Sequence, residues 1–211
     1  NRFNDIRVIN SMPPTRLIGN AALSFITKAS TGYWEIFDPT NGLICLKSSA
    51  IKLLNLDKTD NRYFFETDIL FRAGLSDLII DEISMDAIYA KEVSSLSPSK
   101  ELLNFGVRHI RTMLKRIAYQ YILLDFNPGS ISLIVGTFFI SISCAIGINR
   151  LIIGLMYGET TPAGTLTLFL GCFLAGCQFI IGFAQYDSSQ RVLMRQLKRN
   201  KIVSRKARQL Y

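Results

Sequence analysis

Two long uncharged stretches near the C-terminus constrain the fold of this chain more than any other feature. Residues 131–149 contain no charged side chain, and neither do residues 162–186. Each stretch can cross a hydrocarbon core about 30 Å thick as an α-helix that rises about 1.5 Å per residue. A helix also satisfies its backbone N–H and C=O groups internally, as hydrocarbon requires. We therefore predict a membrane-spanning helical hairpin over residues 131–186; two buried core helices are the alternative.

The net charge of +8 is unevenly distributed along the chain. Residues 1–99 carry −2, residues 100–130 carry +3 and the tail 187–211 carries +7. Lys and Arg residues beside membrane spans favour the cytoplasmic side. We therefore expect both outer ends of the hairpin to be cytoplasmic and the connection 150–161 to face outward. Anionic lipid headgroups account for the basic tail more simply than nucleic acid does.

The first 99 residues alternate predicted helices and strands. Apolar spacing together with Pro, Ser and Gly signals predicts helices over 13–30, 48–55 and 63–74. Aromatic and β-branched runs predict short extended segments over 33–37, 43–46, 78–83 and 85–89. This alternation indicates an α/β domain, of which only a part is present.

Residues 100–124 are predicted to form an amphipathic helix. One face is apolar, and Arg108, Arg111, Lys115 and Arg116 form a basic face, which is typical of a helix lying in the membrane interface. Packing on the soluble domain is the alternative, and both can hold at once. The single histidine, His109, is expected at the surface. The predicted organisation is thus soluble domain 1–99, interfacial helix and linker 100–130, hairpin 131–186 and basic cytoplasmic tail 187–211.

Five groups of residues follow one another along the predicted soluble domain. They are Asn1-Arg-Phe; Met12-Pro with Arg16, Gly19-Asn20 and Lys28; Gly32-Tyr-Trp with Asp38-Pro-Thr-Asn-Gly42; Phe64-Phe-Glu-Thr-Asp with Arg72; and Met85-Asp with Tyr89 and Glu92. With the interfacial helix and hairpin, they resemble the polyisoprenyl-phosphate glycosyltransferases of glycosyltransferase family 2. The resemblance implies the C-terminal, acceptor-binding part of a GT-A domain, with the nucleotide-binding half expected before Asn1.

The resemblance implies phosphate-binding roles for three basic residues. Arg2 and Arg16 match positions that hold the acceptor phosphate, and a guanidinium fork suits a phosphate. Lys28 could assist them. The alternative for each is an ordinary solvated side chain at the surface.

The resemblance also implies roles for acidic residues. Glu66 lies six residues before Arg72, the family's spacing for its catalytic acid, which implies contact with sugar hydroxyls or a base-like role, with Asp68 second. Carboxylates two apart on a helix point about 200° apart, so one of the two is expected to be structural, paired with Arg72. Asp38 opens a turn that the family places near the sugar, with Asn41-Gly42 shaping its backbone.

The implied reaction transfers a sugar from a nucleotide-sugar to undecaprenyl or a related polyisoprenyl phosphate, at the cytoplasmic face of a bacterial membrane. The complete enzyme is expected to need Mg²⁺ or Mn²⁺. Its Asp-x-Asp ligand motif is not found in this chain, and the four cysteines form no metal pattern. Ser84 and Ala90-Lys91 depart from the family's Pro and Gly-Asp.

Homo-oligomerisation is a further expectation, for which the small residues Gly171, Ala175 and Gly176 would allow close helix approach. A processive polysaccharide synthase is disfavoured, because the Trp of its Gln-x-x-Arg-Trp motif has no counterpart here. A non-enzymatic membrane scaffold is the alternative from a different class.

Overall fold

The computed structural model describes residues 14–39, 42–60, 64–83 and 98–209. By its contacts the chain divides into two compact units, which are described separately. The first comprises Asn1–Gln120 and Val192–Tyr211 and is called the helical unit below. The second, Tyr121–Arg191, is called the hairpin unit.

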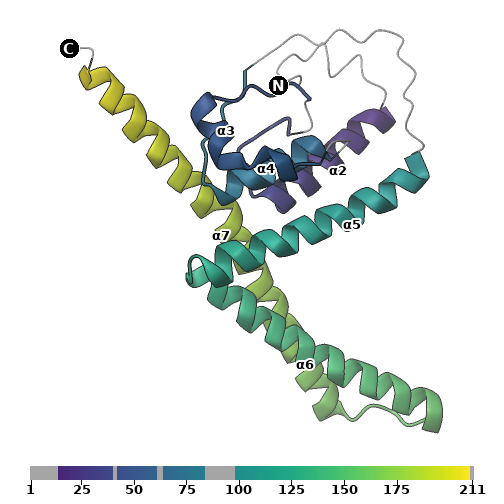
Figure 1. Ribbon diagram of the computed structural model, residues 1–211. Helices are drawn as coiled ribbons and strands as arrows, with labels where there is room; N and C mark the ends of the chain where they lie inside the picture. The colour runs from purple at the N-terminus through teal and green to yellow at the C-terminus, as the bar shows by residue number, and fades with distance from the viewer. Residues whose placement is uncertain (1–13, 40–41, 61–63, 84–97, 210–211) are drawn as a thin grey trace. The chain divides into compact units, whose positions relative to one another are not determined.

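The helical unit is built from helices of different lengths (Figure 1). Its helices are α2 (Pro14–Thr31), α3 (Ser48–Leu54), the 3₁₀ turn η1 (Leu56–Lys58), α4 (Phe65–Leu75) and α5 (Pro98–Ile117), joined by the end of α7 (Ala163–Gln209). The helix α2 packs against both α4 and α5. The predicted helices over 13–30, 48–55 and 63–74 are therefore confirmed.

The α/β fold predicted from the sequence is wrong for the part of the chain that the structure describes, which contains no β-strand. The runs 33–37, 43–46 and 78–83 lie as turns and irregular segments, and the run 85–89 falls outside the described residues. An extended segment becomes a strand only when a neighbouring strand completes its hydrogen bonds.

The backbone N–H groups of these runs form hydrogen bonds within turns or to the end of a helix instead. Ile36 N–H donates to Tyr33 O within a turn, and Leu78 N–H donates to Ala73 O at the end of α4. Their β-prone side chains serve as core instead, because propensity for strands mostly reflects burial. The core consists of Tyr33, Ile36, Leu54, Leu70 and Ala73, with Leu46, Leu56, Leu78 and Ile80 against it.

The hairpin unit contains the predicted pair of apolar helices. The first, α6 (Pro128–Tyr157), begins with a capping box in which Asn127 Oδ1 accepts from Ser130 N–H and Ser130 Oγ accepts from Asn127 N–H. It ends at Gly158, whose φ of +66° suits glycine. The second apolar helix is the first part of α7, and before α6 the π-helical turn η2 (Ala118–Leu123) enters the unit.

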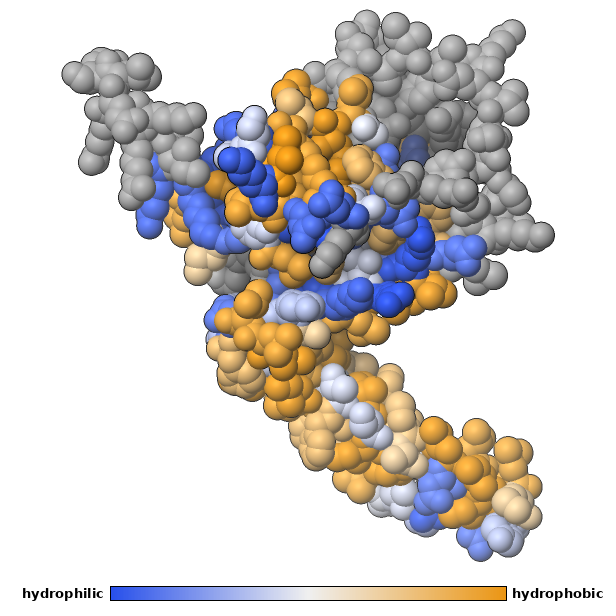
Figure 2. Space-filling view, in the orientation of Figure 1, coloured by the Kyte–Doolittle hydropathy of each residue, from blue (hydrophilic) through white to orange (hydrophobic). Residues whose placement is uncertain are grey.

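Both helices of the hairpin are long and apolar enough to cross a membrane. Only 11 % of the most apolar window of α6 and 17 % of that of α7 is buried within the protein, whereas a soluble core helix would be mostly buried. Apolar side chains accordingly make up most of the hairpin face seen in Figure 2. These features indicate association with a membrane.

Candidate functional site

The loop that follows α2 is the centre of the candidate site. It begins at Gly32, where a φ of +77° ends the helix, and Gly32 N–H donates to Lys28 O over 2.7 Å. Tyr33 is fully buried, and its hydroxyl donates to Leu78 O over 2.7 Å. Burial raises the pKa of the Tyr33 phenol, which keeps it a hydrogen-bond donor. This bond joins the loop of residues 32–39 to the segment that follows α4.

Glu82 holds the far end of the same loop. Its carboxylate accepts from Phe37 N–H over 3.0 Å and from Asp38 N–H over 2.7 Å. These two charge-assisted bonds satisfy backbone donors that have no strand to pair with. Sequence reasoning did not find Glu82, because it lies 44 positions beyond Asp38 and belongs to no motif.

The loop carries Asp38, the first of the acidic residues predicted for the site. Asp38 is 5 % exposed. Lys28 lies near the same segment, with its Nζ 5.6 Å from the centroid of the Phe37 ring. Asp38 and Lys28 thus belong to one region of the helical unit.

Glu66, a second acidic residue predicted for the site, lies in the first turn of α4. A Cβ placed on Gly42 would be 3.3 Å from Glu66 Oε1, so the carboxylate of Glu66 lies against the backbone of Gly42. The structure therefore brings together Glu66 and Gly42, two residues that the sequence placed in one site. Asn41 lies outside the described residues, as does Arg2. Arg16 lies in α2, with its side chain outside the described part.

Asp68 forms an ion pair with Arg72. Its Oδ2 accepts from Arg72 Nε over 3.3 Å and from Asp60 N–H over 3.1 Å. The pairing with Arg72 that we predicted for one of the two carboxylates is therefore observed for Asp68. Among the described residues, no group of three or more His, Cys, Asp or Glu side chains is arranged to hold a metal ion.

The helix α5 has three faces rather than the two predicted. Its buried face is polar and contains His109, Thr112 and Arg116, so the expectation that His109 lies at the surface is wrong. Arg116 Nη2 donates to Ala29 O over 2.9 Å, near the C-terminus of α2, where a cation is favourable. Gln120 Nε2 likewise donates to Gly74 O over 3.1 Å, near the end of α4. The polar face is buried because it completes the carbonyl bonds of two helix ends.

The apolar face of α5 is exposed. Val107, Ile110 and Leu114 are 65 %, 55 % and 59 % exposed, although they are spaced to form one stripe along the helix. The basic face beside the stripe consists of exposed side chains, namely Arg108, Arg111 and Lys115. A helix that buries polar residues and exposes apolar ones presents a surface suited to an apolar partner.

A comparison with characterised proteins supports a distant relationship to glycosyltransferases that act on polyisoprenyl phosphates. Over 114 residues the chain is 31 % identical to a UDP-N-acetylglucosamine–dolichyl-phosphate N-acetylglucosaminyltransferase of Methanococcus voltae. The match covers 54 % of this chain and 45 % of that protein, so the chain corresponds to less than half of its relative. No protein-family model matches the chain, and no solved structure does.

Proposed function

We propose that this chain takes part in transfer of a sugar from a nucleotide-sugar to a polyisoprenyl phosphate at a membrane surface. The observation that carries the proposal is the 31 % identity to a transferase named for a dolichyl-phosphate acceptor. The two apolar helices supply a membrane anchor, which fits a lipid acceptor. Glycosyltransferase family 2 is the finer assignment we propose, and N-acetylglucosamine is the first sugar to test.

In the proposed reaction the acceptor phosphate is the nucleophile. One of its oxygens attacks the anomeric carbon, the bond from that carbon to the nucleotide diphosphate breaks, and the diphosphate leaves. Because the phosphate is already anionic, it needs positioning and charge neutralisation more than deprotonation. We assign that role to Arg2 and Arg16, with Lys28 assisting, and contacts to the sugar to Asp38 and Glu66.

A divalent cation, Mg²⁺ or Mn²⁺, would neutralise the leaving diphosphate in the complete reaction. The described residues do not fit such an ion, since they contain no suitable cluster of ligands. We therefore assign no step of the reaction in this chain to a metal.

We further propose that α5 lies in the membrane interface, with its apolar stripe in the lipid and its basic face toward the headgroups. Transfer from water to lipid lowers the free energy of the exposed side chains of Val107, Ile110 and Leu114. Anionic lipids attract the charges of Arg111 and Lys115. The Lys- and Arg-rich segments that flank the hairpin, residues 100–130 and 187–211, would then lie on the cytoplasmic side.

The depth of α5 can be measured with a nitroxide attached to Leu114→Cys, in protein whose four native cysteines are replaced and which is held in anionic nanodiscs. We expect this label to be reached by lipid-soluble oxygen more than by a water-soluble nickel complex. The matched control is Arg111→Cys on the basic face, where the preference should reverse. Equal access of the nickel complex to both labels would contradict the interfacial position.

Acceptor binding tests the proposed function directly. We expect the protein in nanodiscs to bind a polyisoprenyl phosphate at least about tenfold more tightly than the polyisoprenol of the same chain length, since charge-assisted bonds to phosphate are strong. Arg16→Ala should remove about tenfold of that affinity. Arg150→Ala, between the two apolar runs, is the matched control and should bind normally. Equal binding of phosphate and alcohol would contradict the proposal.

Transfer itself is tested on the product of the complete reading frame that encodes this chain. Labelled UDP-N-acetylglucosamine and a panel of other nucleotide-sugars are offered with a polyisoprenyl phosphate and Mg²⁺. We expect label to appear in the lipid with one of them. Phosphate binding without transfer to any acceptor would favour the scaffold alternative.

A further inference from the structure

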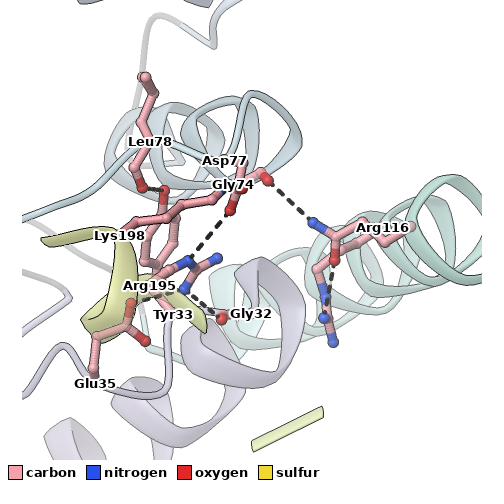
Figure 3. Close-up of polar contacts among 10 residues, drawn as sticks. Gly32, Tyr33, Glu35, Gly74, Asp77, Leu78, Arg116, Arg195 and Lys198 are labelled. Atoms are coloured by element: carbon pink, nitrogen blue, oxygen red, sulfur yellow. Dashed lines mark hydrogen bonds and ion pairs between the residues drawn. The ribbon is translucent and has the colours of Figure 1, made fainter. Parts of the chain in front are cut away.

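The end of α7 contacts two loops of the helical unit through one face. Arg195, Lys198 and Arg199 lie three and four positions apart, so their side chains share that face. Arg195 Nη1 donates to Glu35 Oε1 over 2.8 Å, and Lys198 pairs with Asp77 (Figure 3). Arg199 Nη2 lies 3.1 Å from Asp81 Oδ1. Three basic residues of the tail thus meet three carboxylates of the loops after α2 and α4.

Arg195 differs from the other two because it is buried. It is 4 % exposed, whereas the side chains of Lys198 and Arg199 are 52 % and 58 % exposed. Its guanidinium carbon lies 3.8 Å from the centroid of the Tyr33 ring, within cation–π distance. Its Nη1 also donates to Gly32 O over 3.0 Å, at the C-terminal end of α2. A buried guanidinium is costly unless it is paired. Here it contacts the Glu35 carboxylate, the Gly32 carbonyl and the face of the Tyr33 ring, and its Nε lies 4.0 Å from Asp77 Oδ1.

These contacts fix the beginning of the loop that carries Asp38. The contacted residues Gly32, Tyr33 and Glu35 all lie in its first four residues. Near its other end, Glu82 accepts from the N–H groups of Phe37 and Asp38. Arg195 therefore anchors one end of the loop and Glu82 the other. Arg195 lies 160 positions from Glu35 in the sequence, and Glu82 lies 44 positions from Asp38.

We propose that Arg195 is a positioning residue, which holds the loop of residues 32–39 in the conformation that presents Asp38. The consequence for transfer rests on the function proposed above, but the anchoring of the loop does not. Arg195 belongs to the same continuous helix as the second apolar run. The conformation of the loop at the candidate site thus depends on a residue of the basic tail that no motif identifies.

Hydrogen exchange of the full chain in nanodiscs tests this role. Arg195→Met keeps the length and apolar bulk over Tyr33 but removes the bonds to Gly32 O and Glu35. We expect the amides of Phe37 and Asp38 to exchange at least about tenfold faster, as loss of these two charge-assisted bonds would produce. Core amides of α4, such as that of Ala73, should exchange at the unchanged rate.

Two further variants separate positioning from general destabilisation. Arg195→Lys keeps the charge and should restore part of the loop's protection. Arg199→Met removes an exposed pair and should change loop exchange by less than about twofold. The proposal is overturned if Arg195→Met leaves loop exchange unchanged, if it accelerates the core amides equally, or if Arg195→Lys restores nothing.

Activity of the complete reading frame distinguishes this proposal from the proposed function. If the unmodified protein transfers sugar, Arg195→Met should lower kcat while KM for the polyisoprenyl phosphate stays the same. The disturbed loop carries Asp38, which is assigned to the sugar, whereas the acceptor phosphate is assigned to Arg2 and Arg16. Unchanged kcat would overturn the positioning role and leave the proposed function intact. If the unmodified protein transfers nothing, the exchange measurements still decide whether Arg195 anchors the loop.

Discussion

Lowering the pH from 7 to 4 is expected to reduce the free energy of unfolding of the helical unit by about 3 kcal/mol, chiefly through His109. The imidazole is 2 % exposed, and its Nδ1 lies 2.9 Å from Ser30 Oγ. The rings of Phe64 and Phe105 lie against it, with centroids 4.9 and 6.5 Å away. Burial in this apolar pocket lowers the pKa of His109 from 6.5 to about 4, because the charged form loses its hydration.

The direction of this pH effect follows from how many protons the folded and the unfolded states bind. Between pH 6.5 and pH 4 the unfolded chain binds a proton at this histidine and the folded chain does not. Acid therefore favours the unfolded state throughout that range, and the stabilising effect of the neutral imidazole is complete above it. The protein contains one histidine, so no other imidazole contributes.

Urea unfolding at pH 7, 5.5 and 4, followed by the fluorescence of Trp34, measures this effect. Trp34 is the single tryptophan and lies in the helical unit, so its emission reports that unit alone. His109→Asn is the matched control, since its short amide can still meet Ser30 but does not titrate. It should remove most of the pH dependence above pH 4.5. An equal dependence in the variant would assign the effect to carboxylates and contradict the prediction.

The helices were predictable from the sequence because their signals are local. Pro14, Asn127-Pro128 and Gly158 mark helix ends within a few residues of where the structure places them. The absence of strands from the described residues was not predictable, because the same apolar and aromatic residues suit any buried segment. Tyr33 and Ile36, for example, reach the core from a turn.

Of the candidate site, sequence reasoning found the residues that belong to motifs but not those that hold them. The structure places Glu66 beside Gly42 and pairs Asp68 with Arg72, both within the predicted set. Glu82 and Arg195 were missed, because side-chain contacts across 44 and 160 positions leave no trace in spacing or periodicity. Arg195 is also one of eight basic residues in the tail, which composition alone cannot tell apart.

The burial of His109 and Arg116 was missed for a related reason. A helical pattern of apolar and charged residues predicts which face is which, but not which face meets the rest of the protein. Here the carbonyl groups at the ends of α2 and α4 accept bonds from Arg116 and Gln120. His109, on the same face, meets Ser30 and the ring of Phe64. The apolar stripe is left exposed as a consequence.

Replacing Gly176 with leucine is expected to disrupt the packing of α6 on α7. A Cβ at Gly176 would lie 2.7 Å from Ile140 Cγ1 and 2.9 Å from Ile140 N, and the backbone atom cannot move away as a flexible side chain could. The contact is reciprocal, since a Cβ at Gly136 of α6 would lie 3.1 Å from Ile180 N of α7. Gly176 thus serves close packing within the chain.

The expected loss is about 2 kcal/mol or more, because helices in lipid gain nothing from the hydrophobic effect and depend on close packing. Thermal unfolding in detergent, followed by fluorescence energy transfer between dyes on the two helices, measures the loss. Gly171→Leu is the matched control in the same helix, since a Cβ at Gly171 would meet nothing within 4 Å. It should unfold like the unmodified protein. If the two variants were equally destabilised, helix propensity or detergent contact rather than packing would be responsible, and the glycine contact would have no special role.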